Sequence, residues 1–155
     1  HELFLFEQQF NLGLNNSEIF EKIIHLSRLK IKKVKSLGKH FEKNTHEIRK
    51  QLKDVYYWLK ICPKEIEESF IHMKTLDRML HYLGRWQDHF ILRKKITQYI
   101  KELPKRNEEK LLLKALEKNL INTEDDILDK AWKKWNEIEN KKATVSVALS
   151  APERS

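Results

Sequence analysis

Apolar residues recur at intervals of three and four along most of the chain, a spacing that places them on one face of an α-helix. Only three Gly and three Pro occur among the 155 residues, so breaks between helices are few and short. The segments that this pattern predicts as helices are 17–41, 45–61, 65–83, 85–103, 107–120 and 123–140. We therefore expect an all-α fold, an antiparallel helical bundle of about five to six helices.

The two ends of the chain depart from this pattern. Residues 1–16 are rich in Leu and Phe, and we expect them to dock on the core or to be the tail of a preceding unit. Residues 142–155 are mostly small or β-branched and carry little charge, so we expect a disordered tail there. The expected helical bundle then spans residues 17–141.

The segment 45–59 combines a core face with a face of hydrogen-bond donors. The apolar face consists of Ile48, Leu52, Val55 and Leu59. The opposite face, which we call the donor row, consists of His46, Arg49, Lys50, Lys53 and Tyr57. Solvated helix faces usually mix acids with bases, whereas this row contains no acid. A polyanion is the simplest ligand for such a row.

Positive charge is concentrated around this segment. The chain has a formal net charge of +8, and residues 25–60 contain 11 Lys or Arg against three acidic residues. The rest of the chain is balanced, with equal numbers of basic and acidic residues. A second basic stripe precedes the donor row and consists of Arg28, Lys32, Lys35 and Lys39. This distribution indicates an acidic partner rather than a uniformly charged surface.

Other candidate chemistry is weak in this sequence. His46-Glu47 begins like a zinc-protease motif, but position 50, where a second His is needed, is Lys50. Cys62 is the single cysteine and is expected in the core, and no Gly-rich phosphate loop is present. Asp77 and Asp88 carry no sign of an acid/base pair. We therefore expect no catalytic residues, no metal site, no cofactor and no enzymatic activity.

The sequence also gives an expectation for location. No apolar run approaches the length of a membrane span, and no signal-peptide pattern is present. A lone cysteine suits a reducing compartment. We expect a cytoplasmic protein that does not contact membranes.

Two short segments resemble a known family. Residues 46–57 resemble the first signature of the CHAD family, the conserved-histidine α-helical domain, which reads His-x-x-Arg-Lys-x-x-Lys-x-x-Arg-Tyr. All five residues of the donor row match it, and Tyr56 stands where the family has Arg. Residues 80–88 resemble the second signature, Leu-Gly-x-x-Gln-Asp, through Leu83, Gly84, Gln87 and Asp88.

The resemblance implies a helical bundle that binds inorganic polyphosphate along a basic face or channel. Such domains usually have two similar halves, and this chain resembles the second. A homodimer, or a missing N-terminal half, would then supply the rest of the channel. The residues expected to bind polyphosphate are the donor row (His46, Arg49, Lys50, Lys53, Tyr57), the stripe (Arg28, Lys32, Lys35, Lys39) as the opposite wall, and Arg85, Arg93 and Lys94 from the second signature onward.

Three other functions use the same cations. A nucleic-acid binder would contact RNA or DNA backbones with them, although base readout would need more exposed aromatic residues than this sequence offers. A helical adaptor would present its basic face to an acidic protein. An enzyme acting on phosphate chains would need acidic residues to hold Mg²⁺, and the donor row contains none.

Overall fold

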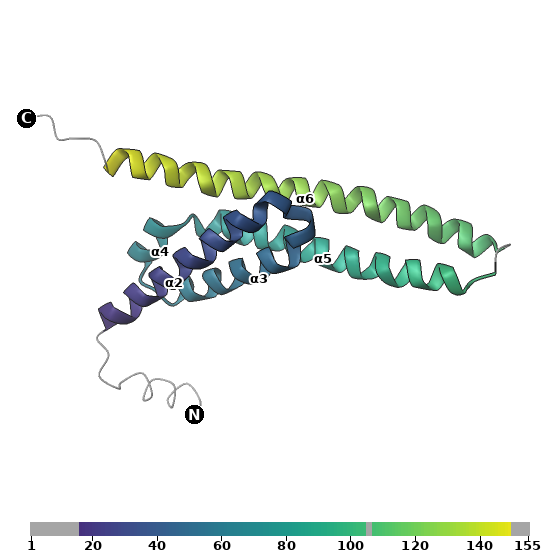
Figure 1. Cartoon of the computed structure of the whole chain (residues 1–155), viewed down its shortest axis with the longest axis horizontal. Helices are drawn as coiled ribbons and strands as arrows, with labels where there is room; N and C mark the ends of the chain where they lie inside the picture. Colours follow the sequence, from purple (N-terminus) through teal and green to yellow (C-terminus); the bar gives the residue numbers. More distant parts are fainter. Residues whose placement is uncertain (1–15, 105–106, 150–155) are drawn as a thin grey trace, which may run out of the picture.

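A computed structural model describes residues 16–104 and 107–149, and every regular element within them is helical. Figure 1 shows their arrangement. The elements are α2 (Asn16–Leu37), the short 3₁₀ turn η1 (Gly38–His40), α3 (Phe41–Lys60), α4 (Lys64–Phe70), α5 (Met73–Glu102) and α6 (Glu108–Leu149). The prediction of an all-α fold is confirmed. The described residues form four long helices and the short α4, fewer long helices than the six predicted.

Two predicted boundaries are absent because the helices continue through them. Gly84 lies inside α5, where Leu83 and Trp86 on either side of it are buried. Tertiary packing of this kind outweighs the roughly 1 kcal/mol by which Gly disfavours a helix interior. Thr123 was expected to begin a helix, but its hydroxyl donates to the backbone carbonyl of Asn119 at 2.8 Å within α6.

One break was not predicted. The chain leaves helical geometry at Ile71, whose φ and ψ are −157° and 149°, and α5 begins at Met73. Ile71 is buried in the core, so the extended residue carries its side chain inward. At the other end, α6 continues to Leu149, beyond the boundary expected at residue 141. The expectations for residues 1–15 and 150–155 lie outside the described residues.

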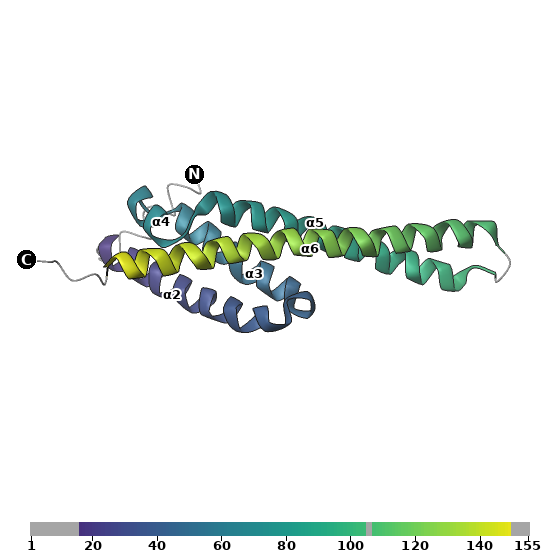
Figure 2. The same cartoon turned by 90° about the horizontal axis from the view of Figure 1, so that it is seen from above.

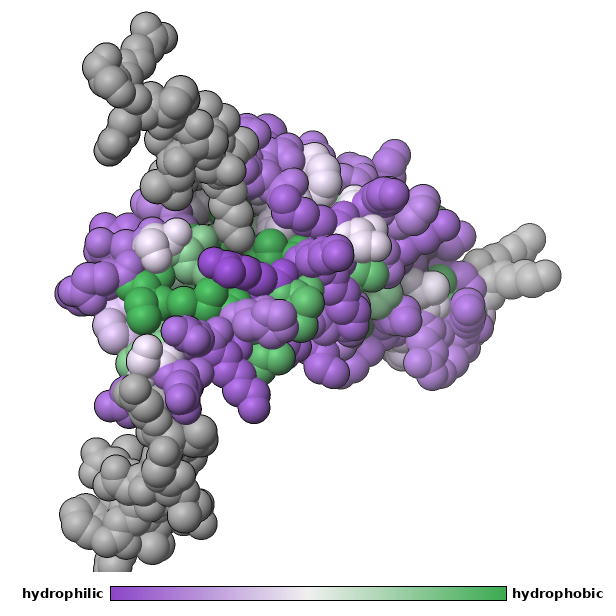
Figure 3. Space-filling view, turned by 60° about the vertical axis from the view of Figure 1, so that its left-hand side comes forward, coloured by the Kyte–Doolittle hydropathy of each residue, from purple (hydrophilic) through white to green (hydrophobic). Residues whose placement is uncertain are grey.

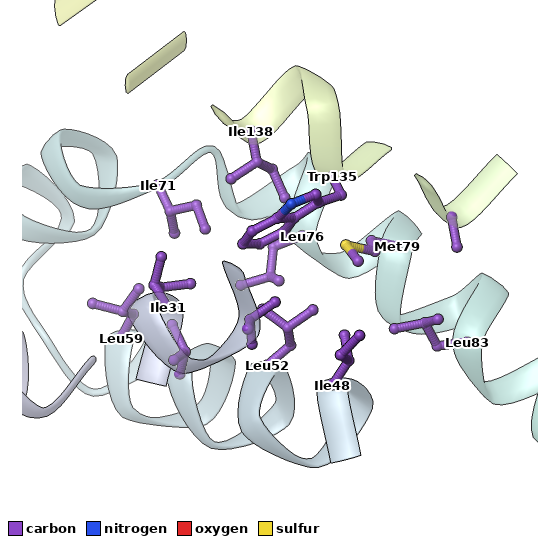
Figure 4. Packing of buried hydrophobic residues seen from close by; sticks show 13 residues of the cluster. Ile31, Ile48, Leu52, Leu59, Ile71, Leu76, Met79, Leu83, Trp135 and Ile138 are labelled. Carbon is purple, nitrogen blue, oxygen red and sulfur yellow. The ribbon is translucent and has the colours of Figure 1, made fainter. Parts of the chain in front are cut away.

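The main core joins α2, α3, the first half of α5 and the second half of α6 (Figure 4). Ile48 and Leu52 of α3 face Leu76 and Met79 of α5, with Trp135 of α6 closing the cluster. All five side chains are almost entirely removed from solvent. The apolar face of α3 therefore points inward, as its spacing predicted, and the donor row lies on the other side of the helix.

The second half of α5 and the first half of α6 extend beyond this core as an antiparallel helical hairpin (Figures 1 and 2). We call its residues 91–104 and 107–121 the arm. Only a small cluster is buried there, formed by Ile96, Ile100 and Leu120. At the opposite end of the molecule, where α2 begins, hydrophobic surface is exposed among hydrophilic side chains (Figure 3).

Candidate anion-binding site

The donor row lies along the outer face of α3. His46, Lys50 and Tyr57 are exposed, whereas Arg49 and Lys53 are half-buried. Within the described part of the chain, none of the four basic side chains takes part in an ion pair. The Lys53 ammonium lies 5.8 Å from the ring centre of Tyr57, so these two side chains adjoin at the C-terminal end of the row. The four basic side chains are thus left outside the ion pairs of the described residues.

Two of the three acidic residues of α3 are directed to α2 instead. Glu47 pairs with Lys33 at 2.9 Å, and Asp54 pairs with Lys30 at 2.7 Å. Gln51 joins the two pairs, because it accepts a hydrogen bond from Lys30 at 3.0 Å and donates one to Glu47 at 2.6 Å. Hydrogen bonds from Lys33 and Gln51 hold the pKa of Glu47 below its ordinary value. These pairs hold the carboxylates of Glu47 and Asp54 to lysines of α2, although Asp54 also borders a cavity with Arg49 and Lys53.

The basic stripe of α2 does not form an opposite wall. Lys30 and Lys33 mark the side of α2 that contacts α3. Helical spacing puts the stripe on a different side of α2. Lys35 of the stripe pairs with Glu139 of α6 at 2.8 Å, and the other stripe residues, Arg28, Lys32 and Lys39, are exposed. The expectation that the stripe faces the donor row across a channel is therefore wrong for this structure.

Arg49 instead meets α5 at Gly84. A Cβ added at Gly84 would lie 3.5 Å from Nη2 of Arg49 and 3.7 Å from its Nε. The guanidinium thus rests against α5 where no side chain intervenes. Its Nε is buried and has no hydrogen-bond partner. The two segments that resemble family signatures, 46–57 and 80–88, therefore contact each other through this pair.

Two cavities adjoin the row and share Arg49 and Lys53. The smaller, of about 190 Å³, is lined by His46, Arg49, Lys50, Lys53 and Asp54. The larger, of about 610 Å³, is open to solvent and lined by Arg49, Lys53, Tyr56, Tyr57, Asp77, Arg78, Leu80, His81, Tyr82 and Lys134. α3, α5 and α6 all contribute to the larger cavity. Its basic residues make it a continuation of the donor row.

Sequence reasoning missed three basic residues of this cavity, Arg78, His81 and Lys134. Arg78 and His81 lie in the helix predicted at 65–83, just before Gly84. Their closeness to the second signature was the sequence signal that could have pointed to them. Lys134 had no comparable signal, because it comes from α6 and reaches the cavity through the packing of that helix beside α5. These residues widen the basic surface beyond α3.

Arg93 has a structural partner that the sequence did not suggest. Its Nε and Nη2 donate to the two carboxylate oxygens of Glu124 at 2.8 and 2.9 Å. The side chain of Glu124 is only 7% exposed. This carboxylate raises the pKa of Arg93. Arg93 therefore ties α5 to α6 through this ion pair, and its expected role as an anion ligand stays a prediction.

The two remaining expected ligands lie apart from the cavities that Arg49 lines. Lys94 places its ammonium 4.7 Å from the ring centre of Phe90. Arg85 is exposed on α5 and lines neither cavity. The structure brings together the donor row, and leaves Arg85 and Lys94 outside it.

The described residues contain no group of three or more His, Cys, Asp or Glu arranged to hold a metal ion. Among residues 16–104 and 107–149, no helix combines the length and apolar character that a membrane crossing requires.

Comparisons with models of protein families, with curated proteins and with solved structures found no match to this chain. The similarity to the CHAD family thus consists of the two short segments described above.

Proposed function

We propose that this protein binds inorganic polyphosphate along α3 and the adjoining α5–α6 surface, without chemistry of its own. The observation that carries the proposal is the set of four basic side chains on α3 that have no acidic partner among the described residues. Arg49 and Lys53 also line the large open cavity. A flexible chain of phosphates needs several cations along a surface rather than one closed pocket.

The side chains suit different parts of this task. The planar guanidinium of Arg49 can donate two hydrogen bonds to one phosphate, whereas Lys50 and Lys53 act as point charges. His46 can donate to a phosphate oxygen and binds anions better when protonated. His81, Arg78 and Lys134 are positioned to hold the chain as it leaves α3, because they share a cavity with Arg49. We also propose that the protein is cytoplasmic, because a single cysteine suits a reducing compartment.

Nucleic acid is the second candidate ligand. Tyr57 is 57% exposed and adjoins Lys53, so one aromatic ring lies beside the basic residues. A single strand of RNA could stack one base there. Polyphosphate remains the better fit, because the other aromatic residues of α3, which are Phe41, Tyr56 and Trp58, are half-buried. The third candidate ligand is an acidic protein. It would need a broad contact surface, and the cavities beside the donor row do not show one.

We also propose that a second copy of the chain covers the arm. Leu112 is 73% exposed, and Leu92, Tyr99 and Leu116 are also exposed on the arm. The hydrogen bond from Tyr99 to Glu109 places the exposed flank of α5 next to that of α6. Exposed apolar residues gathered on one element are typical of an interaction surface.

Competitive binding tests the proposed ligand. Labelled long-chain polyphosphate is displaced by single-stranded RNA, duplex DNA or pyrophosphate at two salt concentrations. We expect polyphosphate to bind most tightly, with an affinity that falls steeply with salt because bound counterions are released. The double variant Arg49→Ala/Lys53→Ala should bind much more weakly, and its slope of log affinity against log salt should be smaller by about 2.

Lys32→Ala is the matched control, because it removes one exposed lysine from the α2 stripe and should leave binding almost unchanged. Equal competition by RNA would favour the nucleic-acid alternative. Unchanged affinity in the double variant would contradict the location of the site.

A further inference from the structure

A third cavity lies at the other end of the donor row. It has a volume of about 410 Å³ and is walled by the start of α3, the middle of α5 and the middle of α6. His46 lines this cavity and also lines the small cavity that holds Arg49, Lys50 and Lys53. The surface is therefore continuous from the third cavity to the cations of α3. Volumes of this size are typical of sites for small organic ligands.

The lining of this cavity differs from that of the cation surface. Trp86 and Phe90 stack with ring centres 5.0 Å apart and form an apolar wall together with Leu128. Glu42 and Asp125 contribute carboxylates to the same cavity, Lys43 contributes an ammonium, and Arg93 and Glu124 there pair with each other. Because the remaining carboxylates outnumber the remaining basic group, this cavity is less favourable for a phosphate chain than the surface of Arg49, Lys50 and Lys53. The cavity requires a group that is uncharged, partly apolar and able to hydrogen-bond at its edge.

A nucleobase has these properties. Its ring is flat and apolar on its faces, and its edge carries donors and acceptors. Gln87 lines the cavity and can both donate and accept hydrogen bonds, while Glu42 and Asp125 can accept them from an amino group. From His46 to Lys53 the helix rises by about 10 Å. That length is comparable with the distance from the base of a nucleoside triphosphate to its terminal phosphate.

We propose that the site binds nucleoside polyphosphates, with the base in the cavity beside Trp86 and Phe90 and the phosphates on Arg49, Lys50 and Lys53. This inference rests on the proposed function, since the same cations hold the phosphates. It adds a preference for a chain of phosphates that ends in a nucleoside. His46 lies where the ribose and first phosphate meet the row.

Titration calorimetry without added metal tests the inference by comparing ATP and GTP with inorganic tripolyphosphate, which has the same number of phosphates. We expect at least one nucleotide to bind about tenfold more tightly than tripolyphosphate, in line with the typical contribution of a base against aromatic side chains. Phe90→Ala should remove this advantage and leave tripolyphosphate binding unchanged. Gln87→Ala, which keeps the apolar wall, should reduce the nucleotide advantage without disturbing the fold.

The outcomes separate the two proposals. Equal affinities of tripolyphosphate and both nucleotides would overturn this inference and leave the polyphosphate site intact. Absence of binding by all three, and by long-chain polyphosphate, would overturn both. A nucleotide advantage that persists in both variants would also contradict the assignment of the base to this cavity.

Discussion

Glu47 shows at the scale of one residue how a carboxylate beside the donor row is held by another helix. It lies next to His46 in the sequence, yet it turns to α2, where Lys33 pairs with it at 2.9 Å. Gln51 donates a second hydrogen bond to the same carboxylate. Lys33 and Gln51 hold this carboxylate, and Lys50 attracts it less strongly than they do. The sequence alone could not predict that Glu47 pairs with Lys33, because this pairing depends on where α2 packs against α3.

Replacing Glu47 with Gln should change how stability depends on pH. The pKa of Glu47 is lowered, first by the hydrogen bond from Lys33 and then by that from Gln51. A group whose pKa is lower in the folded state stabilises the fold above its unfolded pKa, and this contribution is lost as the pH falls through the folded pKa. The parent protein should therefore be more stable than Glu47→Gln at neutral pH, and the difference should shrink as the pH falls below the ordinary Glu pKa of about 4.3.

Urea unfolding at a series of pH values measures this difference. Glu68→Gln, on the exposed surface of α4, is the control and should differ from the parent by a small constant amount. A difference for Glu47→Gln that is the same at neutral and acidic pH would contradict the role of the Lys33 pair.

Arg93 and Glu124 give a second prediction at this scale. Replacement of Glu124 by Ala leaves the half-buried Arg93 guanidinium without its partner, which should lower the free energy of unfolding by about 3 kcal/mol. Lys130→Ala breaks the exposed pair with Asp126 and should cost less than about 1 kcal/mol. Chemical denaturation compares the two variants. Equal small effects would mean that Arg93 is free to act as a ligand, as the sequence first indicated.

At the scale of elements, periodicity predicted the core face of α3 and the helical character of most described segments, because both depend on local spacing, but the disordered tail expected from residue 142 was wrong as far as Leu149. The boundaries of the helices were harder to predict from the sequence. Gly84 and Thr123 carry local signals for a helix end, but packing on both sides keeps α5 and α6 continuous. The break at Ile71 has the opposite cause, since no Gly or Pro marks it and burial of the side chain decides the backbone.

Substitutions at Gly84 test whether α5 positions Arg49 for binding. Gly84→Ala should raise the free energy of unfolding by about 1 kcal/mol, because Ala favours helix and its Cβ would make only ordinary contact with Arg49. Gly84→Leu should displace the guanidinium and weaken polyphosphate binding several-fold while the protein stays folded. Gly38→Ala, whose Cβ would adjoin Trp132 instead, is the control for binding. If Gly84→Leu binds polyphosphate as tightly as the parent protein, Arg49 does not need its place against Gly84 in order to bind.

At the scale of the whole molecule, the donor row could be predicted because its five residues belong to one helix. The large cavity could not, because Arg78, His81 and Lys134 join it only through the way α5 and α6 pack beside α3. The sequence also placed the α2 stripe opposite the row, and the pairing of Lys35 with Glu139 shows that it turns to α6. Packing between helices, not spacing within them, decides which cations act together.

The arm gives a prediction about assembly. Leu112→Glu/Leu116→Glu places two charges on the exposed apolar flank of α6 and should shift a concentration-dependent dimer to monomer. Sedimentation velocity across a wide concentration range measures this shift. The control is Lys118→Glu, an exposed change on the same helix. A parent protein that stays monomeric at the highest concentration while binding polyphosphate tightly would contradict the proposed dimer.

Lysine protection tests the central claim, that polyphosphate binds on α3 and the surface beside it, most directly. The protein is acetylated briefly with and without long-chain polyphosphate, and each lysine is quantified by mass spectrometry. We expect Lys50, Lys53 and Lys134 to be protected by polyphosphate, because they line the two cavities that Arg49 joins. Lys32 on α2 and Lys39 on η1 should react equally in both samples. Protection of Lys32 and Lys39 without protection of Lys50 and Lys53 would contradict the account.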